Sequence, residues 1–575
     1  MTLEISASPL VYQLRIGTVE TSYSIFSIPG QPVGTVPIAI SANSKREPPA
    51  ADAYISLRRT PQKATLLPLF SSPPVIKLAT ELRSRNMVAT ASPASELRAL
   101  ADLINESVKQ IEAVCTSTSQ TYPRADEPFT PQSEGIRMNP DVFEAGNIII
   151  AAASQLLSTV RMPQLTLWIT SGYHFLSSCM RLAIECNISE ILREAGPQGL
   201  HVKEIAVKTG VDSVKLARCL RLLVTHHIFR EVNVDVFSNN RVSSALDTER
   251  PVSELLKSSP KDKFDGTTGL AAVLDHVSDE GLKASGWLPE AIMDKEIGSS
   301  QEPNEAAFRK AYSTDMPIFS WWELPENAWR IKRLAIGMQG LQSMTSRSAI
   351  LEGFKWASLP KKSLVVDVGG SVGSQSLALA QRYEHLNFVV QDRETVMVDA
   401  EKYWNAHFPE AVKGGRVQFQ VHDFFAPQPV KEPAVFLLRM VLHDWSDKYC
   451  AKIISELRKA AGPQTQLLVV DYTVDYACED TTSARNVHGA TVALPPAPLL
   501  ANKGAASIMR YILDMHVLSL NNGDERTVAR FQELFEQCGW KLTEVIQSNN
   551  DPVGFLFFDF DCSGDLIEFI RSYTT

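Results

Sequence analysis

The stretch VVDVGGSVGSQS, from Val365 to Ser376, carries the pattern that decides the fold. An apolar strand ends at Asp367, glycines follow, and a helix begins after them. Glycines permit a tight turn and let a ligand approach the backbone, and a helix N-terminus offers free N–H groups to an anion. Because position 371 is serine, the stretch misses the dinucleotide pattern GxGxxG, and it also lacks the lysine of phosphate-binding loops. It predicts a strand–turn–helix unit that binds a ligand.

The alternation of strand and helix continues from this stretch to the C-terminus. Apolar strands are expected in SLVVDVGG, LNFVVQD, RVQFQVHDFF, AVFLLRMVLHD and QLLVVDYTV, and helices in SQSLALAQRY, DKYCAKIISELRKAAG and TVARFQELFEQCGW. This order implies a mostly parallel sheet with helices on both faces. We therefore expect residues 359–575 to form an α/β, Rossmann-like, doubly wound domain, whose ligands bind at the carboxyl ends of the strands.

Acidic side chains follow the next two strands. Asp392 closes its strand about 20 residues after the glycine turn, where a carboxylate can accept both hydroxyls of a ribose. Asp423 ends the following strand and could accept from an adenine amine, with Phe424 beside the ring. Each acidic residue could instead cap a helix or face solvent in a turn. Together with the glycine turn, they favour a small nucleoside-like cofactor.

A histidine follows the fourth strand, in RMVLHDWSDKYC. His443 could be a packed core residue, a metal ligand or a base. A phenol, with a pKa of about 10, attacks poorly while protonated, and an imidazole, with a pKa of about 6.5, can take that proton. A carboxylate on the other ring nitrogen would fix the tautomer and favour the cation. No HExxH or other tight ligand pattern accompanies His443, so we expect no metal.

The region before the sheet divides into four parts. Residues 1–90 are rich in Pro, Ser and Thr and predict a disordered extension, and a functional start near Met87 is an alternative. Residues 91–140 predict a helix and a polar linker, and residues 141–260 predict helices followed by a winged helix. Residues 261–358 predict a helical connector that contributes to the acceptor pocket.

The winged-helix pattern raises the question of DNA binding. Its second helix, with Asp212 expected as its N-cap, offers Lys215, Arg218 and Arg221 on one face, and its other faces are apolar. The preceding stretch FEAGNIIIAAASQLLSTV is apolar nearly all round, as helices of dimer interfaces often are. A scaffold or dimerisation role is therefore favoured over DNA binding.

The bulk composition is that of a soluble globular protein. The chain has 575 residues, 44% hydrophobic and 21% charged, with a net charge of −9 that argues against a nucleic-acid or anionic-membrane partner. Its eight cysteines form no CxxC pair, so a reducing, cytoplasmic compartment is expected. The N-terminus lacks a secretory signal, and no apolar run of about 18 residues predicts a membrane span.

The motifs DVGGSVG, QD, HDFF, LRMVLHDWSD, VVDYTV and NGDERT occur in this order. The order resembles the S-adenosylmethionine-dependent O-methyltransferases of the caffeic acid/isoflavone type, in the fungal natural-product branch. The resemblance covers roughly residues 140–575 and includes that family's N-terminal dimerisation domain. Ser371 departs from it, because the family usually has glycine there, and a tighter turn is expected.

The resemblance implies a role for each matching residue. His443 would be the general base, and Asp471 and Glu525 would hold its imidazole, although the family often has the longer Glu at position 471. The cofactor would be S-adenosyl-L-methionine, bound by Asp367, Gly369, Gly370, Gly373, Asp392, Asp423, Phe424 and Arg439.

The resemblance also implies an acceptor pocket. Trp321, Trp322 and Trp329 form an aromatic cluster that could line it or belong to an ordinary core. The inserted, proline- and alanine-rich segment 477–505 could form a lid or a plain loop. The residues expected to line the pocket are Met338, Met440, Asp514, Met515, His516, Leu518, Trp321 and Trp322.

The sequence thus predicts a homodimeric, metal-independent methyltransferase that acts on a hydroxyl, phenolic in character, of an aromatic or polyketide-type small molecule. Two alternatives stay open. The same fold could perform a non-methylating reaction such as a decarboxylation or a pericyclic step. A winged-helix regulator that senses a nucleoside ligand would instead need a basic recognition face.

Overall fold

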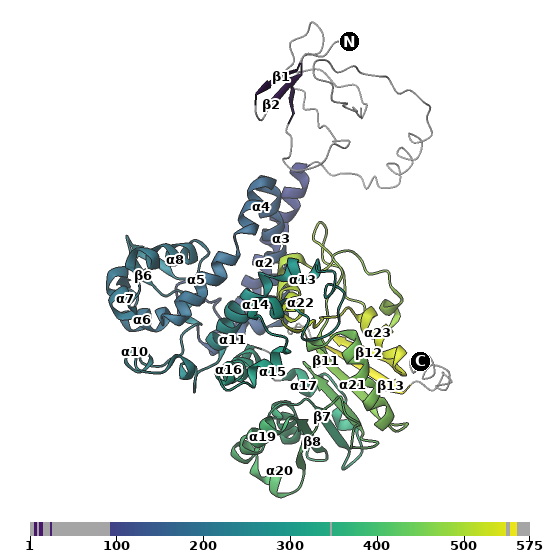
Figure 1. The fold of residues 1–575 in the computed structure, drawn as a ribbon. Helices are drawn as coiled ribbons and strands as arrows, with labels where there is room; N and C mark the ends of the chain where they lie inside the picture. The colour runs from purple at the N-terminus through teal and green to yellow at the C-terminus, as the bar shows by residue number, and fades with distance from the viewer. Residues whose placement is uncertain are drawn as a thin grey trace, which may run out of the picture. The chain divides into compact units, whose positions relative to one another are not determined.

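The computed structural model describes residues 5–8, 11–14, 23–25, 93–344, 348–547 and 553–560 (Figure 1). The chain divides into two compact units, Met1–Thr90 and Ala91–Thr575. In the first unit, three short strands pair antiparallel in the order β1-β2-β3. The predicted disorder of residues 1–90 and the start near Met87 otherwise lie outside the described residues. The strands are β1 (Ile5–Ser8), β2 (Val11–Leu14) and β3 (Tyr23–Ile25).

The second unit begins with two long helices that pack together, α2 (Pro93–Thr118) and α3 (Pro140–Val160). Helix α3 buries only one side of its surface, which leaves Leu157 about half exposed. Although no membrane span was expected, α3 is long and apolar enough to be one, alone among the helices of the described residues. This is weak evidence, because core helices of soluble proteins pass the same test.

A winged-helix arrangement follows, as the sequence predicts. Helix α8 begins at the predicted cap, Asp212, whose carboxylate accepts from the backbone N–H of Lys215 at 2.9 Å. A small antiparallel sheet, in the order β4-β6-β5, forms the wing. The elements are α4 (Pro163–Ser171), α5 (His174–Glu185), α6 (Ile188–Ala195), β4 (Leu200–His201), α7 (Val202–Thr209), α8 (Ser213–Thr225), β5 (Arg230–Asn233) and β6 (Val236–Ser238).

Short helices then connect the winged helix to the sheet. Helices α11 and α16 pack against each other, and a π-helical turn, η3, follows α11 directly. The elements are α9 (Arg241–Ser244), α10 (Val252–Leu255), η2 (Pro260–Asp262), α11 (Leu270–His276), η3 (Val277–Gly281), α12 (Leu282–Ser285), α13 (Leu288–Ile292), α14 (Ala307–Tyr312), α15 (Ile318–Trp322), α16 (Ala328–Met344), α17 (Ser348–Glu352) and η4 (Trp356–Ser358). A further short helix, η1 (Pro131–Met138), lies earlier in the chain, between α2 and α3.

The C-terminal part is a seven-stranded sheet in the order β12-β13-β11-β10-β7-β8-β9, with helices on its faces (Figure 1). Strands β7 to β11 pair in parallel, and β13 pairs antiparallel with β11 on one side and with β12 on the other. This confirms the predicted fold class. The strands are β7 (Leu364–Val368), β8 (Asn387–Asp392), β9 (Val417–Val421), β10 (Val435–Arg439), β11 (Gln466–Tyr472), β12 (Trp540–Gln547) and β13 (Val553–Phe560).

The strand order reverses between β7 and β10. After β7 the chain adds β8 and β9 on one side, and it then returns to place β10 and β11 on the other. Ligands of open α/β sheets bind at such a reversal. The helices of this part are α18 (Ser374–Arg382), α19 (Glu394–His407), α20 (Pro409–Lys413), η5 (Leu442–Asp444), α21 (Asp447–Ala460), η6 (Ser483–Asn486), η7 (Gly504–Ser507), α22 (Ile508–Asn521) and α23 (Val528–Gln537).

Candidate active site

The glycine turn joins β7 to α18 at the strand-order reversal. A Cβ on Gly370 would lie 2.5 Å from the carboxyl carbon of Asp367, and a Cβ on Gly373 would lie 2.8 Å from Nε1 of Trp404. Gly373 also has a φ of +71°, a conformation that side chains rarely adopt. The turn therefore needs glycine at both positions, and it brings the backbone close to whatever binds there.

Asp367 lies buried beneath this turn. Its Oδ2 accepts from the hydroxyl of Ser376 at 2.6 Å. Burial raises the pKa of Asp367 to about 6, against the opposing effects of that hydrogen bond and of the Arg439 charge. Arg439, at the end of β10, thus acts electrostatically on the carboxyl group under the glycine turn.

Ser371 adopts a left-handed conformation, with a φ of +54°. Its backbone N–H donates to Oδ2 of Asp392 at 2.9 Å, and the N–H of Arg393 donates to Oδ1 of Asp392 at 2.8 Å. These bonds fix the carboxylate of Asp392 beside the glycine turn. The turn at Ser371 therefore contains a strained, left-handed residue. The backbone N–H of Ser371 holds the carboxylate of Asp392, the group that is predicted to bind the ribose.

Phe424 lies against the glycine turn. Its ring is 3.6 Å from the place that a Cβ on Gly369 would occupy, and it meets the ring of Trp445 edge to face. Asp423 beside it is exposed, and its carboxylate accepts from the N–H of Phe425 at 3.0 Å. Phe424 thus connects the glycine turn to the turn that carries His443.

Together these residues suit S-adenosyl-L-methionine. The N-terminus of α18 has no side-chain cap, so its backbone N–H groups can receive a carboxylate. The carboxylate of Asp392 can accept from ribose hydroxyls, and Phe424 offers an apolar face to an adenine ring. Asp367, beneath the turn, accepts from the hydroxyl of Ser376 and so links the end of β7 to the first turn of α18.

His443 lies in η5, just after β10. Its Nδ1 is 2.8 Å from Oε1 of Glu525, which lies in the loop after α22. Both side chains are enclosed, and Glu525 is only 2% exposed. A carboxylate on Nδ1 holds the proton there, so Nε2 carries the lone pair of the neutral ring.

Asp471, at the end of β11, lies near this pair without bonding to it. Its side chain is fully buried, and neither carboxylate oxygen has a hydrogen-bond partner among the described residues. Burial raises the pKa of Asp471 to about 6, while the charge of His443 opposes this rise. The shorter residue at position 471 thus acts on the imidazole by charge, whereas Glu525 holds it directly.

The pKa of His443 is raised by its carboxylate neighbours. Burial alone would lower it, but the charges of Asp444, Glu525 and Asp471, together with the Glu525 hydrogen bond, raise it to about 10. Without a ligand, the imidazole is therefore cationic at neutral pH. A cationic ligand beside it would lower this pKa, because like charges disfavour the protonated form.

Arg526 stabilises the loops of the site, although no sequence pattern identified it in advance. Its guanidinium is fully buried and donates to the carbonyl oxygens of Leu442 at 3.1 Å and Trp445 at 2.7 Å, and to Asp447 at 2.8 Å. It thereby fastens the Glu525 loop to the His443 turn. The motif NGDERT contains Arg526, but an arginine in a polar loop is expected to be exposed, and only the tertiary packing shows that this one is buried.

The predicted acceptor residues fall into two groups. Asp514, Met515 and Leu518 line a cavity of about 360 Å³ beside the Glu525 loop, and Asp514 accepts from the N–H of Glu525 at 3.0 Å. His516, on α22, and Trp322, in the helical connector, are instead each in contact with His276. The remaining predicted residues are Trp321, half-buried against Phe308, Met440, half-buried with a φ of +52° after β10, and Met338, exposed on α16.

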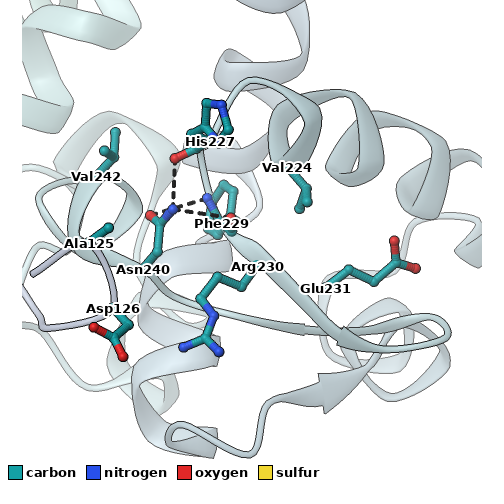
Figure 2. A pocket seen from close by; sticks show the side chains of 9 residues that line it. All are labelled: Ala125, Asp126, Val224, His227, Phe229, Arg230, Glu231, Asn240 and Val242. Atoms are coloured by element: carbon teal, nitrogen blue, oxygen red, sulfur yellow. Dashed lines mark hydrogen bonds between the residues drawn. The ribbon is translucent and has the colours of Figure 1, made fainter.

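A larger cavity, of about 560 Å³, lies in the winged-helix region (Figure 2). The side-chain amide of Asn240 forms part of its wall and donates to the carbonyl oxygens of His227 and Phe229. No lining residue of this cavity belongs to the sheet domain. This cavity therefore lies outside the active site.

Comparisons with known proteins agree with this architecture. Residues 168–249 match the family model of an O-methyltransferase dimerisation domain, and residues 298–541 match that of an O-methyltransferase domain. An O-methyltransferase of Armillaria gallica is 42% identical over 80% of this chain and 97% of its own length. The 4-O-methyltransferase 1 of Phanerochaete chrysosporium is 40% identical over 80% of this chain and 98% of its own length.

Solved structures share the fold. LepI in complex with SAM aligns with a TM-score of 0.54 at 18% identity, over 74% of this chain and 96% of that one. A pericyclic reaction enzyme aligns with a TM-score of 0.53, also at 18% identity, over 73% of this chain and 95% of that one. At such identity the likeness concerns the fold alone.

Proposed function

The chain belongs to the O-methyltransferase family, and on that premise we propose that His443 is the general base that deprotonates a phenolic hydroxyl of the acceptor. The cofactor of this family is S-adenosyl-L-methionine. The acceptor is an aromatic or polyketide-type small molecule. The observation that carries the proposal is the 2.8 Å contact between Nδ1 of His443 and Glu525, next to the glycine turn.

Each residue around His443 has a separate role in the removal of the proton. The bound cofactor supplies a methyl group on a positively charged sulfur. Nε2 of His443 takes the proton of the hydroxyl, and Glu525 stabilises the resulting cation through Nδ1. Asp471 adds a second negative charge from the buried side. Arg526 fixes the distance between the Glu525 loop and the His443 turn, so the imidazole stays in position to reach the acceptor hydroxyl.

The base needs no metal in this proposal, because an imidazole with a carboxylate partner can remove a phenolic proton unaided. Among the residues that the structure describes, no group of three or more His, Cys, Asp or Glu side chains could hold a metal ion. A chelator should therefore leave turnover unchanged.

The two alternatives have less support. The contact between Nδ1 of His443 and Glu525 is the arrangement that a proton-removing base requires, and it supports methyl transfer over a non-methylating reaction. In the winged helix, Arg221 pairs with Glu231 at 3.1 Å and with Asp235 at 2.6 Å, so the basic face that DNA would require is partly neutralised.

The proposal includes a cytoplasmic homodimer. The exposed apolar side of α3 and the dimerisation domain beside it offer a surface for a second copy. The seven described cysteines are all unpaired, which fits a reducing compartment.

The experiment combines cofactor labelled in its methyl group with a panel of phenols, with and without a chelator. We expect label transfer to at least one phenol, and we expect His443→Ala to lower turnover by a factor on the order of 10² or more. Binding of S-adenosylhomocysteine should change by less than about threefold, because His443 bonds to Glu525 and not to the glycine turn. The matched control is His407→Ala, an exposed histidine at the end of α19. Unchanged turnover in His443→Ala would refute the role of His443.

A further inference from the structure

We propose that Gln301 and Glu302 are positioning residues for the base, because they bind both the turn that follows His443 and the loop that carries Glu525. The two residues, which we name the 301–302 clasp, lie in the loop between α13 and α14. This inference rests on the proposed function and adds to it two residues of the helical connector. Neither residue was among those expected at the site.

Gln301 caps the helix that follows the base turn. Helix α21 begins after Ser446, whose side chain makes no cap bond to the helix. Oε1 of Gln301 instead accepts from the backbone N–H of Lys448 at 2.8 Å. The hydroxyl of Ser446 donates to the carbonyl oxygen of Gln301 at 2.8 Å. The first N–H groups of a helix need acceptors from outside it, so the start of α21 depends on a residue 147 positions away in the chain.

Glu302 binds the first turn of the same helix through its side chain. Its carboxylate pairs with the ammonium group of Lys448, and Oε2 accepts from the hydroxyl of Tyr449 at 2.6 Å. The hydrogen bonds from Lys448 and Tyr449 lower the pKa of Glu302. Burial and the bond to Glu302 raise the pKa of Tyr449 to about 12. At neutral pH, Glu302 is therefore an ionised acceptor and Tyr449 a donor.

Tyr449 connects Glu302 to the base turn through Trp445. The ring of Tyr449 stacks on that of Trp445, with centroids 5.7 Å apart and an angle of 27° between the planes. Trp445 follows His443 by two residues, and its ring meets that of Phe424 edge to face at 5.9 Å. The carboxylate of Glu302 is thus linked, through two aromatic rings, to the turn that carries the base.

Glu302 also binds the loop that carries Glu525. The backbone carbonyl oxygen of Glu302 accepts from Nδ2 of Asn522 at 2.9 Å. Asn522 follows α22 in a left-handed conformation, with a φ of +55°, and the chain turns there towards Glu525. In the same loop, the N–H of Asp524 donates to the carbonyl oxygen of His443 at 2.9 Å. Glu302 therefore contacts both of the segments that supply the pair of His443 and Glu525.

Two sets of contacts thus hold the base turn and the Glu525 loop together. Arg526 acts from the buried side, where its side chain is 0% exposed, and the 301–302 clasp acts from the solvent side, where the side chain of Glu302 is 35% exposed. A catalytic group that is misplaced by about 1 Å can lose a factor of about 10² in rate. Loss of the clasp should therefore reduce turnover even though the clasp does not touch the acceptor.

An ordinary surface ion pair would behave differently. The side chain of Lys448 in its pair with Glu302 is 48% exposed, and exposed pairs contribute little to folding stability. If the clasp were only such a pair, its loss would change neither turnover nor stability. A positioning role instead predicts a large loss of turnover with almost no change in thermal stability.

The test compares Glu302→Ala with the wild-type protein, at saturating S-adenosyl-L-methionine and with a phenol that accepts labelled methyl. Above the rising limb of the pH profile, we expect kcat to fall about tenfold. The KM for the phenol and the affinity for S-adenosylhomocysteine should change by less than about threefold, because the clasp lies away from the glycine turn. The thermal unfolding midpoint should stay within about 3 °C of the wild-type value.

The pKa of His443 provides a readout that a merely structural role would not change. Burial alone would lower this pKa, but the carboxylate neighbours raise it to about 10. A looser contact with Glu525 weakens their effect, so the rising limb of kcat/KM in Glu302→Ala should move to lower pH by about half a pH unit or more. NMR of protein labelled at histidine should show the same fall in the pKa of His443 without any acceptor. The resonance is assigned by its loss in His443→Ala.

Three further variants make the result specific. Tyr449→Phe removes the hydroxyl that binds Glu302 and should lower kcat about threefold, and it should add nothing to the loss in Glu302→Ala, because both remove the same bond. Glu302→Gln keeps an acceptor for Tyr449 and should retain kcat within about threefold of the wild-type value. Glu290→Ala removes an exposed carboxylate on α13 and should change neither kcat nor the pKa of His443.

Either of two results would overturn the clasp: an unchanged kcat in Glu302→Ala, or a lower kcat with an unchanged pKa of His443. If Glu302→Ala does not fold, the same two measurements on Tyr449→Phe decide. The outcome is separable from that of the proposed function. If no phenol accepts labelled methyl but the pKa of His443 falls in Glu302→Ala, the proposed function fails and the clasp stands. If methyl is transferred and neither kcat nor this pKa responds, only the clasp fails.

Discussion

On the cofactor side of the active site, the bond between Ser376 and Asp367 joins residues nine apart in the chain, and on the base side the bond between His443 and Glu525 joins residues 82 apart. The glycine turn of the cofactor side lies within one strand–turn–helix unit, and Asp392 and Phe424 join it from the ends of the next two strands along the chain. The base side is made of buried charges from separate loops. A single substitution in the glycine turn can therefore disrupt cofactor binding locally, whereas the arrangement of the base side depends on long-range packing.

The largest effect should follow from removing the charge that holds the base. In Glu525→Gln, the amide can still accept from Nδ1 of His443, but it no longer stabilises the cation. We expect turnover to fall by about 10- to 100-fold.

The pH profile of Glu525→Gln should shift as well. The pKa of His443 is raised to about 10 by its carboxylates, so kcat/KM in the wild-type protein should rise with pH from about neutral as the ring loses its proton. Removing one negative charge lowers that pKa, so the rising limb should move to lower pH. The matched variant Asp471→Asn removes a charge that makes no hydrogen bond and should shift the limb in the same direction with a smaller loss of turnover. A limb that stays in place in both variants would contradict the assignment of His443.

The next effect concerns the glycine turn. Gly373→Ala places a Cβ 2.8 Å from Trp404 and 2.9 Å from Val390, at a φ of +71°. We expect S-adenosylhomocysteine affinity to fall by about tenfold or more, because the backbone must move away from the ligand.

Gly415→Ala is the matched control for this prediction. Gly415 has nearly the same conformation, with a φ of +68°, but nothing lies within 4 Å of the added Cβ. It should cost about 1 kcal/mol of unfolding free energy and leave cofactor affinity unchanged. Equal affinities in the two variants would contradict the prediction, because they would show that a Cβ at position 373 does not displace the backbone that contacts the cofactor.

The smallest expected effect is a gain in the free energy of unfolding. Ser371→Gly relieves a left-handed residue and keeps the N–H that donates to Asp392. We expect the free energy of unfolding to rise by about 0.5–1 kcal/mol, since the relieved strain exceeds the entropy cost of the added glycine. Chemical denaturation measures this change. A lower free energy of unfolding would show that the serine side chain has a stabilising contact of its own.

The order of the elements could be predicted because each signal is local. Strand β7, which ends at Val368 and not at the expected Asp367, the cap at Asp212 and the alternating strands of the sheet follow from apolar periodicity and from backbone preferences within a few residues. The same holds for the glycine turn and for the acidic residue that closes β8. The resemblance to a family added His443 and Glu525, whose partnership no local pattern contains.

Only the tertiary structure shows which charged side chains are buried and which other charges lie beside them. The sequence could not separate Asp471, a buried carboxyl without a hydrogen bond, from Glu525, which holds the imidazole. It did not distinguish Arg526 from an exposed loop arginine, and it did not pair His276 with His516 from helices 240 residues apart. Local preferences act along the chain, but the pKa of a buried group depends on which distant charges the fold brings beside it, and packing alone determines that.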